Sequence, residues 1–550
     1  MAVALVEQGQ HNALAQESRP PMALFQHRAY GEYAPGFREN QQKNNTKSKW
    51  RPPPARCRKI IASPWEGRYS RLMHRSTLRP RALLLPVSVM LLWPAWLPAQ
   101  SGPPRLETRT DLLEETNHIP TRRPAQTLDP VIQKIVAQIS EQRVADIMRR
   151  LGEFETRHTA SDPTQAKRGI GAARQWIFDQ FKSFSPRLQV SFDTYTIAKT
   201  NRLYKQTELR NVLAILPGNA PDATNRWILI SGHYDTINLK DAAGLAPAQA
   251  AELPAPGVSD DASGTACALE CARVMSQYEF GATLVFVAFA GEEEGLYGSR
   301  ALARRLQRQG QAIEALLNND IIGNEVSGNG FSDKHRVLVF SEDPNDSASR
   351  QIARFIHATA ARYCPDMAAE IIFRYDRFGR GGDHTPFNQE GYAAVRFTTP
   401  NENFAQQHTS LDTFANASPA YAARVVRVNA AAAALMALAP APPVTSYAAG
   451  TPAGNLVLPN RPGLSRGAGY DAVLRWSDPE EGPDLAGFAV VIRSTTAPDW
   501  EKEIWAGNVH QFTMPDTPID QIVLGVKAVD LQGHESPVAA YVNPSRAGGP

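Results

Sequence analysis

The 550-residue sequence predicts an α/β domain with a mostly parallel central sheet flanked by helices, followed by a smaller all-β sandwich. Two observations support this prediction. Short apolar runs that are typical of buried strands alternate with helical patterns over about three hundred residues, which favours βαβ units. After a proline-rich segment at 440–450, short stretches alternate apolar with polar residues, as in antiparallel sheets with one buried face.

The first hundred residues are predicted to lie outside the fold. Residues 1–72 are polar and aperiodic, and we interpret them as an extension from a mis-assigned translation start. Met73 opens a basic segment, which an apolar stretch and the small residue Ala99 follow, so residues 73–99 are predicted to be a signal peptide. The protein is therefore expected to be secreted or periplasmic. The alternative is a membrane-anchored protein with a basic cytoplasmic tail.

The net charge of +3 is unevenly distributed along the chain. Residues 1–72 carry twelve Lys/Arg against five Asp/Glu, and residues 73–99 add three arginines and no acid, which leaves about −7 for the remainder. A mildly acidic body gives no support for nucleic-acid binding. Of the four cysteines, Cys267 and Cys271 lie four apart on a predicted helix, where buried thiols are more common than a disulfide.

A linker at 100–127 leads into the globular part, which is predicted to span 128–439. Its first helices are indicated by apolar residues at helical spacing through 144–151 and 170–181. Further helices are expected at 262–278, 347–364 and 417–438, and strands at 190–195, 211–216, 227–231, 283–290, 315–317, 337–340, 370–375 and 393–397.

Residues 440–450 are expected to be a proline-rich linker, and residues 451–545 to form the sandwich. Trp476, the alternating strand that begins at Gly487, and the segment AVDLQGHES make this part similar to a fibronectin type III domain. It contains no cluster of catalytic residue types. Substrate docking, cell-surface docking and chain stability are all open as its role.

Polar residues gather at the predicted carboxyl ends of strands, where open α/β sheets bind ligands. The strand at 283–290, for example, runs directly into three consecutive glutamates. The candidate residues at these ends and in adjoining loops are His233, Asp235, Asp260, Asp261, Glu292, Glu293, Glu294, Asp320, Asp383, His384, His408 and Asp412. Each piece alone has an ordinary explanation, such as a solvated turn, a helix N-cap or a hydrogen-bonded pair.

Together, so many carboxylates at one rim repel one another unless cations balance them. A pair of divalent metal ions provides that balance. Imidazole with carboxylate and no thiolate indicates zinc first, with manganese or cobalt as possible substitutes.

In order and spacing, the segments SGHYDT, SDDASG, AGEEEGLYGS, NNDIIG and HTSLDT resemble the secreted di-zinc aminopeptidases of metallopeptidase family 28, over roughly residues 130–440. The resemblance implies the zinc exopeptidase fold, two zinc ions per chain and peptide substrates. We also expect no stable membrane partner. It places one zinc on His233, Asp260 and Asp320. The other zinc would be held by Asp260, Glu293 and His408.

The same resemblance implies roles for residues that do not bind metal. Glu292 would be the general base, which takes a proton from the attacking water and delivers it to the leaving amine. Asp235 would fix the tautomer of His233. A cis peptide is implied between Asp260 and Asp261. Glu294 has no such role, and we expect it to be a solvated or helix-start carboxylate.

Three alternatives to an aminopeptidase remain. A single-zinc glutaminyl cyclase-like enzyme is disfavoured because both histidines and both aspartates are present. A carboxypeptidase-like enzyme would need a basic pocket, which the sequence does not identify; Arg380 could contact substrate, but its spacing to Asp383 departs from the arrangement expected. A non-catalytic binding protein is disfavoured because the general base and the metal ligands are all present.

Overall fold

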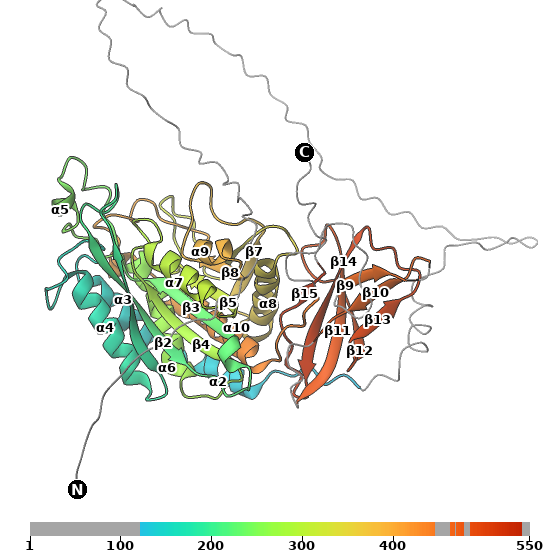
Figure 1. Cartoon of the computed structure of the whole chain (residues 1–550). Helices are drawn as coiled ribbons and strands as arrows, with labels where there is room; N and C mark the ends of the chain where they lie inside the picture. Colours follow the sequence, from blue (N-terminus) through green and yellow to red (C-terminus); the bar gives the residue numbers. More distant parts are fainter. Residues whose placement is uncertain (1–121, 446–462, 468, 478–483, 542–550) are drawn as a thin grey trace, which may run out of the picture. The chain divides into compact units, whose positions relative to one another are not determined.

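The computed structural model describes residues 122–445, 463–467, 469–477 and 484–541. The predicted extension at 1–72, the predicted signal peptide at 73–99 and parts of both predicted linkers lie outside the described residues. Within the described ranges the chain forms an α/β region and a C-terminal β region (Figure 1).

The α/β region is built on an eight-stranded mixed sheet. Its strands are β1 (Gln189–Ile197), β2 (Thr207–Leu216), β3 (Trp227–His233), β4 (Thr283–Phe289), β5 (Ile313–Asn319), β6 (Arg336–Ser341), β7 (Ala368–Ile372) and β8 (Ala394–Thr398). They lie in the order β1-β2-β4-β3-β5-β8-β6-β7. Four of the seven pairings are parallel, and three of these join β4, β3, β5 and β8 at the centre. The predicted α/β fold is confirmed.

Helices cover both faces of this sheet (Figure 1). They are α2 (Pro130–Gln138), α3 (Glu141–Gly152), α4 (Gly169–Phe184), α5 (Pro247–Ala250), α6 (Ser263–Met275), α7 (Tyr297–Arg308), α8 (Ala348–Tyr363), α9 (His384–Gln389) and α10 (Pro419–Leu438). Alternate strand residues point to opposite faces, so Ile228 and Ile230 of β3 enter one core and Leu229 enters the other. The first core contains residues of α2, α3, α4, α6, α8 and α10, and the second contains residues of α7 and α9.

Four helices, α2, α5, α7 and α9, lie outside the ranges predicted from the sequence. α2 begins after Asp129, whose side chain accepts a hydrogen bond from the Ile132 amide at 3.2 Å, and Pro130 opens the helix. This is a recognised helix-start signal. α7 is rich in arginine and buries few apolar side chains, which gives it a weak sequence pattern. The strand expected at 370–375 begins two residues earlier and ends at Ile372.

α10 is the one helix in the described ranges that is long and apolar enough to cross a membrane. Its most apolar stretch is 83% buried inside the protein. Its alanines and valines belong to the first core, where α10 packs against α6 and α8.

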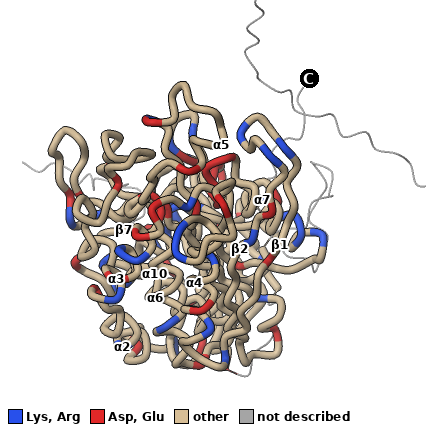
Figure 2. The backbone as a smooth tube through the Cα atoms, turned by 90° about the vertical axis from the view of Figure 1, so that its left-hand side faces the viewer, with Lys and Arg blue, Asp and Glu red and all other residues tan. Residues whose placement is uncertain are grey.

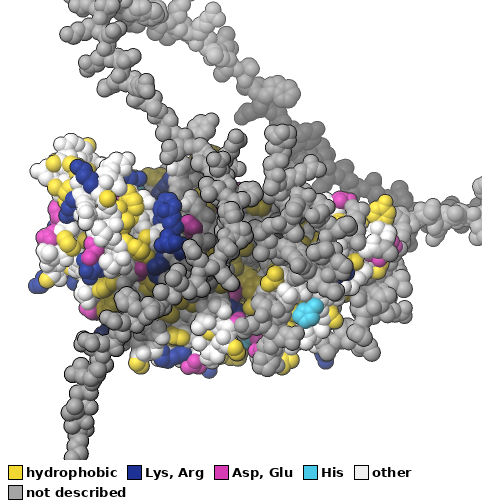
Figure 3. Space-filling view, viewed as in Figure 1, with side chains coloured by type: hydrophobic (Ala, Val, Ile, Leu, Met, Phe, Trp, Pro, Cys, Tyr) yellow, Lys and Arg dark blue, Asp and Glu magenta, His cyan; other side chains and the backbone are white. Residues whose placement is uncertain are grey.

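On the described surface of the α/β region that Figure 3 shows, acidic, basic and apolar side chains are interspersed.

The C-terminal region contains two antiparallel sheets. Its strands are β9 (Gly463–Arg466), β10 (Ala472–Arg475), β11 (Leu485–Ser494), β12 (Lys502–Gly507), β13 (Gln511–Met514), β14 (Ile522–Asp530) and β15 (Ala539–Ala540). One sheet has the order β13-β10-β9 and the other β12-β11-β14-β15. Trp476, Phe488, Phe512 and Val526 meet in a core that both sheets share. The predicted sandwich is thus present, and its likeness to a fibronectin type III domain stays a prediction.

One close approach in the α/β region positions the site. At Gly232, the residue before His233, a Cβ atom would lie 2.2 Å from the carbonyl carbon of Gly264 and 2.5 Å from the Thr265 amide nitrogen. Only glycine lets the end of β3 lie this close to the first turn of α6. The loop that precedes α6 is thereby held beside His233.

Candidate metal centre and active site

The five predicted metal ligands come together at the carboxyl ends of neighbouring strands. His233 ends β3, Glu293 follows β4, and Asp320 follows β5. Asp260 precedes α6, and His408 lies in the loop between β8 and α10. They form two groups, and within each group the ligand atoms lie within 4.8 Å of one another. The groups are His233, Asp260 and Asp320, and Asp260, Glu293 and His408.

Asp260 belongs to both groups and presents one oxygen to each. Its Oδ1 lies 3.2 Å from His233 Nε2, and its Oδ2 lies 3.0 Å from His408 Nε2. Asp320 Oδ1 lies 3.9 Å from His233 Nε2, and Glu293 Oε2 lies 3.2 Å from His408 Nε2. A single carboxylate therefore joins two potential ion positions.

The chemistry of these residues fits divalent metal ions. Glu293 Oε1 is buried and has no hydrogen-bond partner among the described residues, so it is available as a ligand. Burial lowers the pKa of His408, but the Glu293 and Asp260 carboxylates outweigh burial and raise it to about 11. The site therefore attracts positive charge strongly. Two imidazoles with three carboxylates match the donor preference of zinc.

The loop around Asp260 is held by two further carboxylates. The peptide between Asp260 and Asp261 is cis, as the family resemblance implied. Asp261 Oδ2 accepts the His233 amide at 3.1 Å, and its Oδ1 accepts the amides of Gly264 at 2.8 Å and Ile321 at 3.2 Å. It thereby ties the ends of β3 and β5 to the start of α6.

Asp412 holds the same loop from its other side. Its carboxylate accepts the amides of Ser259 at 2.8 Å and Asp260 at 2.9 Å. The segment HTSLDT thus contributes both His408 and a carboxylate that fixes the backbone of the shared aspartate. Neither Asp261 nor Asp412 has a role assigned from the sequence, although both lie within the recognised motifs.

Asp235 contacts His233 by a route that differs from the expected one. His233 Nδ1 lies 3.2 Å from the backbone carbonyl of Asp235 and donates to it, whereas the nearer carboxylate oxygen of Asp235 is 3.7 Å away. That carboxylate accepts the amides of Glu292 at 3.2 Å and Glu293 at 3.1 Å. The backbone of Asp235 therefore sets the His233 tautomer, and its side chain positions the glutamates.

Glu292 lies beside the two metal groups and belongs to neither. It is half-buried. Burial raises the pKa of its carboxyl well above the usual value, and Asp320 and Glu293 shift the pKa in the same direction, against His233. A carboxyl group with a raised pKa can both accept and donate a proton near neutral pH.

The expectation for Glu294 is wrong, because its side chain is 1% exposed. The Thr159 hydroxyl donates to Glu294 Oε2 at 2.5 Å, and His158 Nδ1 lies 3.4 Å from Oε1. Thr159 also lies 3.4 Å from the Asp235 carboxylate. The chain turns sharply at Gly291 and Gly295, which have positive φ angles, so the third glutamate points into the protein.

Two buried arginines surround the site, and no sequence motif points to either. The Arg157 guanidinium donates to four backbone carbonyls, those of Tyr234, Leu151, Pro256 and Gly257, at 2.6 to 2.8 Å. Burial lowers its pKa to about 10, so it stays charged at neutral pH. It joins the loop after β3 to the loop before Asp260.

Arg396, on β8, contacts a predicted ligand directly. Its Nη1 donates to Asp320 Oδ2 at 2.6 Å and to the Gly381 carbonyl at 3.0 Å. Burial raises the pKa of Asp320, but Arg396 and His233 outweigh burial and hold it below the usual range. Arg396 thus occupies one oxygen of Asp320, while the other faces His233.

Asp383 and His384 are buried near the site but join neither metal group. Burial raises the pKa of Asp383 to about 7, against His233 and the Ser299 hydroxyl, which lower it. His384 Nε2 lies 3.3 Å from Asp376 Oδ2.

Acidic residues gather near α5 in the view of Figure 2.

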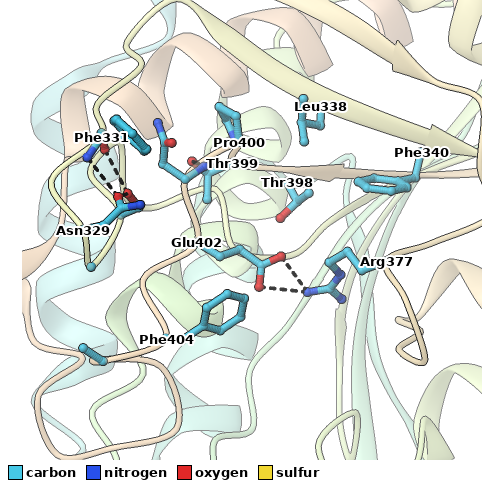
Figure 4. A pocket seen from close by; sticks show the side chains of 14 residues that line it. Asn329, Phe331, Leu338, Phe340, Arg377, Thr398, Thr399, Pro400, Glu402 and Phe404 are labelled. Atoms are coloured by element: carbon cyan, nitrogen blue, oxygen red, sulfur yellow. Dashed lines mark hydrogen bonds and ion pairs between the residues drawn. The ribbon is translucent and has the colours of Figure 1, made fainter. Parts of the chain in front are cut away.

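One cavity adjoins the site, and a second cavity is a neighbour of the first. One, of about 600 Å³, has His408 in its wall. The other, of about 590 Å³, has the aromatic side chains Phe331, Phe340 and Phe404 in its wall together with the Arg377–Glu402 ion pair (Figure 4). Phe404 contributes to both cavities, so they are neighbours.

Replacing Glu294 by Ala should lower the free energy of unfolding by about 1–3 kcal/mol, because the buried Thr159 hydroxyl loses its acceptor. Glu294→Gln retains an acceptor and should cost less. Urea denaturation at fixed zinc concentration measures both. Glu153→Ala, at a glutamate whose side chain is 53% exposed and ion-paired to Arg150, is the matched control and should change stability little. Equal stability of Glu294→Ala and the control would contradict the buried position.

The family model for Peptidase family M28 matches residues 211–433. A "Probable zinc metalloprotease" of Pyricularia oryzae is 36% identical over 450 residues, which cover 75% of this chain and 84% of the relative. Another protein of that name, from Leptosphaeria maculans, is 34% identical and is covered over 97% of its length, against 75% of this chain. Among solved structures, the LapA aminopeptidase of Legionella pneumophila is 19% identical with a TM-score of 0.43, covering 57% of this chain and 76% of that one.

Proposed function

The chain belongs to peptidase family M28, and from this premise we propose that it is a di-zinc aminopeptidase that removes N-terminal residues from peptides. The observation that carries the proposal is the pair of three-residue groups joined through Asp260. A shared carboxylate between two groups of nitrogen and oxygen ligands suits a pair of ions that act on one substrate.

In this proposal each group holds one zinc. His233, Asp260 and Asp320 bind the first, and Asp260, Glu293 and His408 bind the second. The chemistry that zinc supplies when bound is polarisation of the scissile carbonyl and acidification of a water molecule. Arg396 and the Asp235 carbonyl orient their ligands so that an Asp320 oxygen and His233 Nε2 face the same point.

Glu292 moves the proton. As a carboxylate, it accepts a proton from the attacking water at one of its oxygens, and as an acid it donates that proton to the nitrogen of the leaving amine. Two observations support this role: Glu292 lies outside both metal groups, and its pKa is raised by burial and by neighbouring carboxylates. The Asp235 carboxylate fixes the backbone on which Glu292 stands.

The surroundings of the site support a substrate with a free amine. The carboxylates concentrate negative charge, which attracts the N-terminal ammonium of a peptide. The His408 side chain is 26% exposed, whereas His233 is 1% exposed, so the site opens toward His408 and its cavity.

Reporter peptides with a free N-terminal leucine should be hydrolysed, and the same peptides with an acetylated N-terminus should not. A chelator should abolish turnover, and added zinc should restore it. Product analysis by mass spectrometry distinguishes the alternatives. Release of the C-terminal residue would support a carboxypeptidase instead, and cyclisation of an N-terminal glutamine would support a glutaminyl cyclase.

The first two glutamates of the triplet should separate metal binding from proton transfer. Glu293→Ala should lose or weaken one zinc, and activity should fall with metal content. Glu292→Gln should keep both ions while turnover falls about 10²- to 10⁴-fold. The zinc content and the kcat of each purified variant are measured together. Zinc lost from Glu292→Gln but kept in Glu293→Ala would reverse the two assignments.

Arg396→Met should weaken zinc binding about 10- to 100-fold, because Asp320 loses the partner that orients it. Arg396→Lys should recover part of the affinity. Competition with a chromophoric chelator measures both. Arg226→Met is the control, because Arg226 is a buried arginine paired to Glu314 at 3.0 Å, near the opposite ends of the same strands. An equal loss of zinc affinity in both methionine variants would show that Arg396 has no specific role.

A further inference from the structure

The cavity of about 600 Å³ beside His408 has a fixed relation to the candidate metal centre. The Leu239 amide donates to the His408 carbonyl at 2.9 Å, which holds the 239–240 loop against the ligand loop. Gln407, also in the cavity wall, donates from Nε2 to Asp260 Oδ2 at 2.8 Å. A molecule in this cavity is therefore adjacent to the reacting groups.

The wall of this cavity carries positive charge. Lys240 and Arg380 line it from two different loops, and no Asp or Glu is among its lining residues. Lys240 is exposed and makes no ion pair or hydrogen bond within the described ranges. It is therefore free to bind an anion.

Arg380 has a partner that it can give up. Its Nη1 lies 2.6 Å from Glu402 Oε2. Both oxygens of Glu402 also bind Arg377 Nη1, at 3.1 and 3.2 Å, as Figure 4 shows. The Arg377 side chain is 13% exposed and that of Arg380 is 31% exposed. If Arg380 turned toward a ligand, Glu402 would remain neutralised by Arg377.

Apolar groups border the same cations. Leu239 is 54% exposed and Phe404 is 71% exposed, and both line the cavity. The Arg380 guanidinium lies 5.9 Å from the centre of the Phe404 ring, which limits its orientation. The combination suits a carboxylate attached to a short hydrocarbon chain.

We propose that this cavity binds a carboxylate of the peptide substrate, on a residue next to the scissile bond, through Lys240 and Arg380. The inference rests on the aminopeptidase function proposed above. Two kinds of carboxylate have this chemistry: the C-terminal carboxylate of a dipeptide, and the side chain of Asp or Glu. A basic pocket for a substrate carboxylate could not be identified from the sequence, because Lys240 and Arg380, which line this cavity, are far apart in the chain.

Three pairs of peptides distinguish the sources, using the zinc-loaded full chain. The pairs are Leu-Leu with Leu-Leu-amide, Leu-Asp-amide with Leu-Asn-amide, and Asp-Leu-amide with Asn-Leu-amide. In at least one pair, kcat/KM should be about 10- to 100-fold higher for the member that carries the extra carboxylate. The pair that shows the preference identifies the source. Both members of a pair carry the same N-terminal ammonium, so added salt should reduce the preference between them by screening the extra carboxylate.

Lys240→Met and Arg380→Met should each lower kcat/KM for the preferred carboxylate substrate about 10-fold or more, without changing it for the matched peptide that has a carboxamide in place of the carboxylate. Arg380→Lys should retain part of the preference. Lys134→Met and Arg304→Met remove exposed cations on α2 and α7 and should change neither value. Because Lys240 is exposed, its replacement leaves the core intact.

Two results would overturn the inference: equal kcat/KM within all three pairs, or an equal loss on carboxylate and carboxamide peptides in the Lys240 and Arg380 variants. Absence of turnover on all six peptides is a different result. It would contradict the proposed aminopeptidase function itself, and with it this inference.

Discussion

Balancing buried negative charge at the carboxyl ends of β3, β4 and β5 is the constraint on which the rest of the structure depends. The buried carboxylates that converge there are those of Asp235, Asp260, Asp261, Glu293, Glu294, Asp320 and Asp412. Unpaired, each would carry a large desolvation cost. The fold supplies backbone amides to Asp235, Asp261 and Asp412, and a hydroxyl to Glu294. Asp260, Glu293 and Asp320 keep oxygens that face the two histidines.

Two buried arginines complete this balance. Arg157 binds only backbone carbonyls, so its charge stabilises the loops without occupying a carboxylate. Arg396 binds a predicted ligand but takes the oxygen that faces away from His233. Both arrangements position ligands in advance, as preorganised sites require. In the neighbouring cavity wall, the Glu402 carboxylate forms ion pairs with both Arg377 and Arg380.

The alternation of strands and helices could be predicted from the sequence, because buried strands are visible as apolar runs. Strand ends and adjoining loops indicated twelve candidate residues, and the choice of five metal ligands among them came from the resemblance to metallopeptidase family 28. Other features depend on contacts between distant segments. Arg157 lies in a segment without periodicity, and its partners are carbonyls, which any residue possesses. The burial of Glu294 depends on two glycine turns, and the cavity cations Lys240 and Arg380 meet only in three dimensions. The α7 helix was not predicted, because arginines interrupt its pattern of apolar residues.

In the proposed di-zinc site, the position of Asp260 in both groups would link the binding of one ion to the binding of the other. The first ion to arrive would orient the shared carboxylate for the second, which favours binding, and would also add a repelling charge, which opposes it. Whichever effect is larger, thermodynamics requires the coupling to be reciprocal: each ion alters the affinity of the other by the same factor. A buffer or inhibitor that removes one ion would therefore also change the affinity of the site for the other ion.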